Sequence, residues 1–241
     1  MPMKLFLSAI LFSFITSACT KENKMPVTPV INHSNSNSGG SFSYLALGDS
    51  YTIGESVPQG DSFPYQLQAL LNASGKKTET PKIIAKTGWT TDELQAAINQ
   101  AKITQKFDFV TLLIGVNNQY RGYPIDTYKK EFTELLKTAI AFANGKAERV
   151  FVVSIPDWGV TPFAKGSAKS AQTIATEIDI FNKANEEITL QAGARYTNIT
   201  PDSRKASDDV SLIAADGLHP SGKMYSNWSN ALLSQVVKSL E

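Results

Sequence analysis

The sequence predicts an α/β fold: a three-layer α/β/α sandwich in which helices cover both faces of a parallel sheet of about five strands. Two observations predict this class. From residue 42 onward, short apolar runs rich in β-branched or aromatic residues alternate with longer segments of helical period. Strand-helix units of this kind form right-handed crossovers, which leave neighbouring strands parallel. The range 42–241 contains no internal repeat and no second boundary, so a single domain is expected.

The strand candidates are compact and apolar throughout, which is the pattern of strands buried on both faces of a sheet. Four of them are strong and the fifth is weaker. They are, in chain order, 42–48, 82–88, 107–115, 149–156 and, as the weaker one, 194–200.

The helix candidates lie between and after these strands. Apolar residues recur at steps of three and four from Phe132 to Ala143, so this helix is expected to present one apolar stripe to the sheet. Thr90 and Glu93 have the spacing of a capping box at the start of another helix. The full set of helix candidates is 64–74, 91–105, 125–144, 169–192 and 221–240.

The composition argues against several classes of function. The chain has 241 residues, with 23 Lys and Arg against 22 Asp and Glu, and no long run of one sign, so no nucleic-acid partner is expected. A single cysteine cannot form an internal disulfide. One cysteine and two histidines also form no cluster at the spacing of zinc ligands. We therefore expect no structural metal and no cofactor.

Residues 1–18 have the features of a cleaved secretory signal. A positive charge at Lys4 precedes the apolar stretch 5–15, which is too short to span a bilayer. The small residues before Cys19 make this signal similar to those of bacterial lipoproteins, although Thr16 stands where such signals usually have leucine. The resemblance implies export to the bacterial cell envelope and lipidation of Cys19, with membrane contact through the lipid alone. The alternative is ordinary secretion, with Cys19 left as a free thiol or removed.

The segment 19–41 is predicted to be a flexible linker. It holds two prolines followed by a run of Asn, Ser and Gly without apolar period. Such a composition cannot bury enough apolar surface to offset the entropy cost of ordering. His33 lies in this segment and is expected to be solvated, so His219 is the only histidine left for chemistry in the domain.

Glycine and polar residues stand where four strand candidates end. The carboxyl ends of parallel strands share one edge of a sheet, and ligand sites of open α/β sheets form there. The four ends are Gly-Asp-Ser at 48–50, Thr-Gly-Trp at 87–89, Gly-Val-Asn-Asn at 115–118 and Pro-Asp-Trp at 156–158. We expect these polar groups to converge on one rim.

Four separated signals, taken in order, resemble the SGNH (GDSL) hydrolase family of serine esterases. They are Gly-Asp-Ser at 48–50, the isolated Gly88, Gly-x-Asn-Asn at 115–118, and the pair Asp216 and His219. The resemblance covers essentially everything after the linker. It implies a flavodoxin-like fold, serine esterase activity, and an oxyanion hole formed by Ser50, Gly88 and Asn117.

Two positions distinguish the chain from related patterns. The family's usual aspartate after the oxyanion asparagine is replaced by Asn118, which puts the rigidity of that loop in question. Thr52 stands where the Gly-x-Ser-x-Gly elbow of ordinary α/β-hydrolases has its second glycine. This second difference favours the flatter serine loop of SGNH enzymes.

Side-chain chemistry leads to the same residues. The hydroxyl of Ser50 is a poor nucleophile unless a base removes its proton, and His219 is the only histidine available. Asp216, three residues earlier, can accept from the imidazole and fix its tautomer. The candidate oxyanion donors are the N–H groups of Ser50 and Gly88 and the side-chain amide of Asn117.

Each of these residues also has a purely structural interpretation. His219 could be a surface histidine beside a capping aspartate, and Gly88 could be a turn glycine before a helix. Asn117 could serve only to stabilise its loop. Asp49, although adjacent to Ser50, is expected to hydrogen-bond within its loop rather than to act as the catalytic acid.

Aromatic residues near the strand ends are candidate walls of a substrate site, with local packing as the alternative. They are Tyr51, Trp89, Tyr120, Tyr123 and Trp158. The expected activity is hydrolysis of a small-molecule or glycan carboxylic ester through an acyl-enzyme. Carbohydrate O-deacetylase, short-chain esterase, lysophospholipase and thioesterase all stay open, and a catalytically silent glycan-binding lipoprotein is the rival from another class.

Overall fold

The structure, a computed structural model, describes residues 40–241. The predicted signal peptide at 1–18, the predicted lipidation site Cys19 and His33, which is predicted to be solvated, lie outside the described residues. The last two residues of the predicted linker are described, and the hydroxyl of Ser41 donates to the carboxylate of Glu79 at 2.9 Å.

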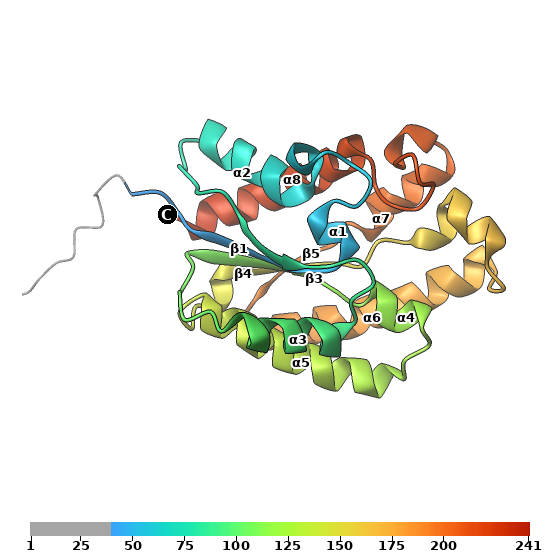
Figure 1. The fold of residues 1–241 in the computed structure, drawn as a ribbon, viewed down its shortest axis with the longest axis horizontal. Coiled ribbons are helices and arrows are strands. Elements are labelled where there is room, and N and C mark those ends of the chain that lie inside the picture. Colours follow the sequence, from blue (N-terminus) through green and yellow to red (C-terminus); the bar gives the residue numbers. More distant parts are fainter. Residues whose placement is uncertain (1–39) are drawn as a thin grey trace, which may run out of the picture. The chain divides into compact units, whose positions relative to one another are not determined.

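The described chain forms the predicted α/β fold around one parallel sheet (Figure 1). Its strands are ordered β2-β1-β3-β4-β5, and every neighbouring pair is parallel. The strands are β1 (Tyr44–Gly48), β2 (Lys82–Ala85), β3 (Phe109–Leu113), β4 (Val150–Val153) and β5 (Arg195–Thr197). The three central strands β1, β3 and β4 are completely buried, whereas the edge strands β2 and β5 are partly exposed. The strand β5 has only three residues, which explains why its sequence signal is weak.

Helices cover the two faces of the sheet in separate layers (Figure 1). One layer contains α2 (Phe63–Ala73) and α8 (Gly222–Ser239). The other contains α3 (Thr91–Ala101), α5 (Ile125–Phe142) and α6 (Ala171–Gln191). No described helix is both long enough and apolar enough to cross a membrane.

The apolar stripe predicted on 125–144 is buried in the structure. Phe132, Leu135, Leu136 and Ala139 are at most 1% exposed and belong to the hydrophobic core. Burying a large apolar side chain of this kind contributes about 1.5–3 kcal/mol, so this stripe holds α5 onto the sheet.

Several predicted helices and strands are longer than the elements that the structure contains. The helix predicted at 91–105 ends at Ala101 because Lys102 adopts a left-handed conformation with φ +47°. The strand predicted at 82–88 ends at Ala85 because residues 86–89 form a turn, closed by a hydrogen bond from Trp89 N to Lys86 O at 3.2 Å.

Three short helices follow strands but have no sequence signature. They are α1 (Ser50–Ile53), α4 (Val116–Tyr120) and α7 (Thr200–Ser203). Each is shorter than two helical turns, so hydrophobic periodicity cannot reveal it. Because α7 begins at Thr200, the strand predicted at 194–200 is limited to β5.

A close approach of backbone segments places Ser50 at the edge of the sheet. A Cβ atom on Gly48 would lie 2.1 Å from Thr52 Oγ1 and 2.3 Å from the Leu113 carbonyl oxygen. Only glycine allows the chain to turn this tightly against the end of β3. The turn leads directly into α1, at the edge where the order of strands reverses about β1 and ligand sites form in such sheets.

Candidate active site

Ser50 is the first residue of the short helix α1. The carboxylate of Asp49 caps this helix by accepting the Tyr51 N–H at 3.0 Å. Ser50 itself is 5% exposed. Within the described part of the chain, the Ser50 N–H donates to no acceptor, so it is available to a ligand at the helix start.

Asp216 and His219 form a short loop immediately before α8. Nδ1 of His219 lies 2.6 Å from Oδ2 of Asp216. The other carboxylate oxygen accepts the N–H groups of Leu218 at 2.9 Å and of His219 at 3.0 Å. Gly217, with φ +74°, makes the tight turn that allows this arrangement. Because an ionised carboxylate only accepts hydrogen bonds, Nδ1 carries the proton and Nε2 is left as the basic nitrogen.

The charge of Asp216 is well stabilised. Its side chain is 30% exposed, and partial burial alone would raise the pKa of this carboxyl group. Hydrogen bonds from His219, Ser56 and the backbone of the loop outweigh burial and hold the pKa of Asp216 well below its usual value. The carboxylate therefore stays ionised throughout the neutral range.

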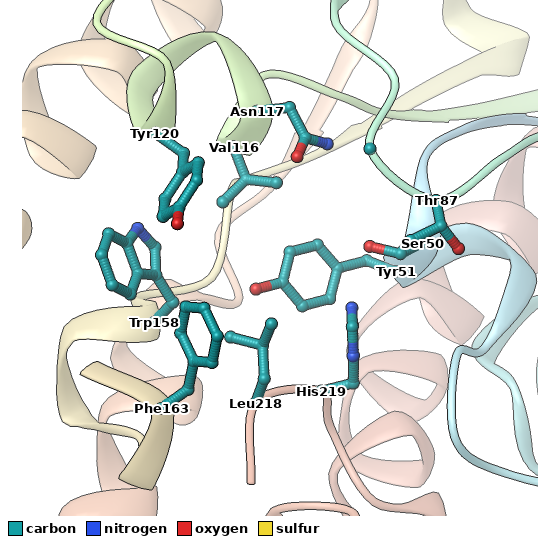
Figure 2. A pocket seen from close by; sticks show the side chains of 11 residues that line it. Ser50, Tyr51, Thr87, Val116, Asn117, Tyr120, Trp158, Phe163, Leu218 and His219 are labelled. Carbon is teal, nitrogen blue, oxygen red and sulfur yellow. The ribbon is translucent and has the colours of Figure 1, made fainter. Parts of the chain in front are cut away.

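The imidazole of His219 is packed against Tyr51. The two ring centroids are 5.5 Å apart at an interplanar angle of 62°, an edge-to-face contact. In Figure 2, a ring nitrogen of His219 points toward Ser50. Among the hydrogen bonds of residues 40–241, none joins the Ser50 hydroxyl to His219. In ligand-free enzymes a catalytic hydrogen bond is often long or not yet formed, so the absence of this bond does not conflict with a Ser-His pair.

Gly88 and Asn117 bring two further donors to the same place. Gly88 has φ +85°, and its N–H donates to no acceptor within the described residues. The Asn117 Nδ2 donates one proton to the carbonyl of Trp89 at 2.9 Å. An amide nitrogen carries two protons, so the second proton of Asn117 is available to a ligand.

One pocket brings these residues together (Figure 2). Its volume is about 170 Å³, and Ser50 and His219 lie on the same side of it. The pocket is lined by Ser50, Tyr51, Thr87, Gly88, Val116, Asn117, Tyr120, Trp158, Phe163, Leu218 and His219. Four residues singled out from the sequence, Ser50, Gly88, Asn117 and His219, therefore face a common space.

Three aromatic rings form the wall of the pocket farthest from Ser50 in Figure 2. The Trp158 ring lies 5.4 Å from that of Tyr120 and 6.1 Å from that of Phe163, both edge to face. Tyr120 and Phe163 are 54% and 44% exposed, so this part of the wall is open to solvent.

A hydrogen-bonded chain fixes the central ring of this wall. The indole N–H of Trp158 donates to Gln119 Oε1 at 2.8 Å, and Gln119 Nε2 donates to Glu177 at 2.6 Å. Lys169 forms an ion pair with Glu177 at 2.6 Å. Burial raises the pKa of Glu177, but the hydrogen bonds from Lys169 and Gln119 lower it overall. The wall is therefore anchored to α6.

Not every aromatic candidate belongs to the pocket. Tyr51, Tyr120 and Trp158 line it. Trp89 instead packs against the hydrophobic core, and Tyr123 faces a separate groove beside α6. No sequence pattern singles out Phe163, because it lies in a segment of short turns. Its N–H donates to the Gly217 carbonyl at 2.9 Å, and this hydrogen bond holds it at the pocket.

Asn118, the departure from the family pattern, is fully buried and well bonded. Its Oδ1 accepts the Thr91 N–H at 3.1 Å, and its Nδ2 donates to the Thr91 hydroxyl at 2.7 Å. The Thr91 hydroxyl donates in turn to Glu131. The amide thus holds the loop through two bonds, of which an ionised aspartate could make only the first.

Asp49 is a buried carboxyl group beside the candidate nucleophile. Its side chain is 0% exposed, and Oδ2 has no hydrogen-bond partner among the described residues. Burial raises the pKa of Asp49 to about 7, although the hydrogen bond from Tyr51 N–H opposes this rise. Residues 40–241 contain no group of three or more His, Cys, Asp or Glu side chains that could hold a metal ion.

The fold is an α/β sandwich, and its pocket gathers a serine, a carboxylate-bound histidine and unused hydrogen-bond donors at the carboxyl edge of the parallel sheet. The chain belongs to the GDSL-like lipase/acylhydrolase family, whose family model matches residues 46–226. No protein among the curated sequences matches the chain significantly.

Several solved structures align with this chain over most of their length. TesA aligns with a TM-score of 0.61 and 16% identity, over 82% of this chain and 99% of TesA. The acetylxylan esterase Axe2 of Geobacillus stearothermophilus aligns with a TM-score of 0.61 and 17% identity, over 82% and 95% of the two chains. A lipase/acylhydrolase of Enterococcus faecalis aligns with a TM-score of 0.62 and 20% identity, over 81% and 95%. At these identities the similarity establishes the fold.

Proposed function

We propose that the protein is a serine hydrolase that cleaves carboxylic esters through an acyl-enzyme intermediate. The observation that carries this proposal is that Ser50, Gly88, Asn117 and His219 line one pocket while Asp216 binds His219. Capping of α1 does not account for Ser50, because the cap of this helix is Asp49. A purely structural role for Ser50 would also leave unexplained a carboxylate-bound histidine and two unused donors at the same pocket.

In the acylation step, Ser50 Oγ attacks the carbonyl carbon of the ester while Nε2 of His219 takes the hydroxyl proton. The electron pair of the carbonyl moves to its oxygen, which faces the N–H groups of Ser50 and Gly88 and the free amide proton of Asn117. Each donor of this type contributes about 3–4 kcal/mol to stabilisation of the tetrahedral intermediate. Collapse of the intermediate breaks the bond to the alcohol oxygen, which leaves with the proton from His219.

In the deacylation step, His219 takes a proton from water, and the hydroxide oxygen attacks the acyl carbon. The same donors hold the second oxyanion. Its collapse releases the acid, and the proton returns from His219 to Ser50. Asp216 stabilises the imidazolium form of His219 in both steps and keeps Nε2 directed at the pocket.

We propose that the substrate carries a short acyl group, with acetyl esters of carbohydrates as the leading case. A pocket of about 170 Å³ is smaller than the ~300–1,000 Å³ typical of sites for larger ligands. Val116, Trp158 and Leu218 give it apolar walls suited to a small acyl group. The structural similarity to an acetylxylan esterase is consistent with this choice.

A second candidate is a lysophospholipase or thioesterase that accepts a longer acyl chain. The exposed rings of Tyr120 and Phe163 favour it, because they extend the apolar wall from the pocket to the surface. A chain too long for the pocket could lie along these rings.

The test of the proposed chemistry uses Ser50→Ala. The wild type should hydrolyse p-nitrophenyl acetate and be labelled by an alkyl phosphonate at one residue, as a structurally similar esterase, EstA of Pseudoalteromonas sp., is inhibited by monoethylphosphonate. The S50A variant should lose turnover and labelling while retaining its thermal unfolding midpoint. Wild-type activity in S50A would refute the proposal, and sugar binding without labelling would indicate the silent glycan-binding protein.

The choice between acyl lengths is made with acetyl, butyryl and decanoyl esters. A short-chain enzyme should show the highest kcat/KM on acetyl or butyryl esters, and Phe163→Ala should leave this value within about twofold because acyl groups of that size do not reach the rim. A long-chain enzyme should prefer the decanoyl ester and lose this preference in Phe163→Ala, through a higher KM.

We also propose export and attachment to the cell envelope through a lipid on Cys19. The support is the sequence of residues 1–19 alone. Expression of the full chain in a bacterial host should place it in the membrane fraction, and Cys19→Ser should release it. Equal membrane association of both forms would refute lipid attachment.

A further inference from the structure

The turn that carries Gly88 is held by residues of α4 and by the C-cap of that helix. Asn117 Nδ2 donates to the carbonyl of Trp89 at 2.9 Å. Arg121, which caps α4, donates from Nη2 to the carbonyl of Gly88 at 2.6 Å. A guanidinium hydrogen bond of this length to a carbonyl is a strong, charge-assisted contact.

These contacts fix the peptide that follows Gly88. Its carbonyl is bound by Arg121, and its N–H, on Trp89, donates to the Lys86 carbonyl at 3.2 Å. Gly88 is the third residue of this turn and has φ +85°, the conformation that a type II turn needs at that position. With the following peptide bound at both groups, rotation about Gly88 is restricted. The direction of the N–H of Gly88, a residue that lines the pocket, is restricted with it.

Arg121 is itself held by Glu93. Nη1 lies 3.3 Å from each carboxylate oxygen, and the same carboxylate accepts the Thr90 N–H at 2.9 Å. Both side chains are 41% exposed, and neither lines the pocket. An exposed ion pair of this kind contributes little to stability. The most specific contact of Arg121 is therefore its hydrogen bond to the carbonyl of Gly88, a candidate oxyanion donor.

We propose that Arg121 is a positioning residue that holds the Gly88 N–H in register with the other two oxyanion donors. The inference rests on the proposed function, since it assigns Arg121 to the oxyanion hole of that reaction. Donors must lie within ~0.5 Å of their productive position to stabilise a transition state. Loss of Arg121 frees the Gly88 carbonyl and the turn rotates, so the N–H no longer matches the oxyanion.

The test compares Arg121→Ala and Arg121→Lys with the wild type on one ester. Removal of an oxyanion donor lowers kcat by about 10²–10³-fold, so displacement of one donor in R121A should lower it by about 10-fold. An interaction made in the transition state changes kcat and kcat/KM equally, so KM should stay within about twofold. Lysine keeps the charge but cannot bind the carbonyl and Glu93 as a fork, so R121K should be intermediate.

Two further measurements separate positioning from a general loss of structure. Added guanidinium chloride at low millimolar concentration should restore part of kcat in R121A, whereas sodium chloride at equal ionic strength should not. Glu93→Gln keeps the cap on Thr90 but removes the ion pair, and the R121A/E93Q double variant should be no slower than R121A, because the two residues act as one unit. Lys137→Ala, which breaks an exposed ion pair with Glu134 on α5, is the matched control and should retain wild-type kinetics.

Unchanged kcat in R121A overturns the inference, and so does a rise in KM at constant kcat, which would place Arg121 in substrate binding. A fall in kcat without rescue by guanidinium, together with a lower unfolding midpoint, also overturns it in favour of a structural role. These failures differ from failure of the proposed function. In that case the wild type itself hydrolyses no ester and Ser50 is not labelled.

Discussion

Oγ of Ser56 lies 2.7 Å from Oδ2 of Asp216, so a hydroxyl from the segment after α1 binds the carboxylate that holds His219. The two residues are 160 positions apart in the chain. This contact joins the segment after Ser50 directly to the loop that carries His219. Ser56 has φ +65°, a left-handed conformation that serine seldom adopts.

Removal of the Ser56 hydroxyl should slow catalysis without unfolding the protein. We expect Ser56→Ala to lower kcat by about 3–10-fold, because a hydrogen bond to a charged group contributes ~1.5–3 kcal/mol and its loss lets Asp216 and His219 shift. Ser56→Gly should lower kcat similarly and raise the unfolding midpoint relative to S56A, since glycine tolerates positive φ. Steady-state kinetics and thermal unfolding of both variants check this. Full activity in both would show that the hydroxyl does not orient the carboxylate.

Replacement of Asp216 by asparagine should be far more severe. An amide that faces Nδ1 of His219 donates to it, which puts the ring proton on Nε2 and removes the base. We expect Asp216→Asn to lower kcat by about 10³–10⁴-fold with a nearly unchanged KM. Because the pKa of Asp216 is well below its usual value, protonation of Asp216 should contribute nothing to the pH dependence of wild-type activity near neutral pH. A D216N variant within tenfold of the wild type would contradict this assignment.

The buried carboxyl of Asp49 should make stability depend on pH. Burial raises its pKa from 3.8 to about 7, so the folded state binds this proton more tightly than the unfolded chain. The free energy of unfolding therefore falls as pH rises from about 4 to about 7 on account of this group, and the loss is complete above pH 7. At ~1.4 kcal/mol per pKa unit the effect at pH 8 is about 4 kcal/mol.

Asp49→Asn keeps an acceptor for the Tyr51 N–H and removes the titration. We expect D49N to exceed the wild type in free energy of unfolding at pH 8 and to approach it at pH 4, as measured by urea denaturation. Equal differences at both values of pH would show that Asp49 is not the group responsible. Activity measured alongside reports whether the charge itself is used near Ser50.

Restoring the family's aspartate at position 118 should destabilise this particular chain. Asn118→Asp replaces the donor to the Thr91 hydroxyl with a second acceptor, and that hydroxyl already donates to Glu131. Leaving a buried polar group unpaired costs about 1–3 kcal/mol, and the cost should be larger at pH 8 than at pH 5 because the new carboxylate is buried. Asn230→Asp, at an exposed position of α8, is the control and should change stability by less than ~0.5 kcal/mol. Equal stability of N118D and the wild type would show that the amide is not required.

The central sheet could be predicted from the sequence because β1, β3 and β4 are buried on both faces and read as continuous apolar runs. The positions of Ser50, Gly88 and Asn117 follow from the same reasoning, since each stands just beyond the end of a strand. Parallel strands bring such positions to one edge whatever the loops do.

The remaining parts of the site depend on contacts that no local pattern encodes. Ser56 and Arg121 bind partners across the chain, and both lie in segments where polar residues are the rule. Phe163 reaches the pocket through a backbone hydrogen bond to Gly217. Such contacts depend on how the loops pack against the folded sheet, so sequence periodicity and propensity do not reveal them.

All five strands of the sheet run in the same direction, so the turns before the strands lie at the edge opposite the pocket. None of the eleven residues that line the pocket comes from the turns at 74–81, 102–108 or 144–149. Insertions, affinity tags or attachment to a solid support at those turns leave the mouth of the pocket open to bulky polymers. Substitutions at the edge with the pocket can therefore change substrate specificity, while the turns at the opposite edge can change independently.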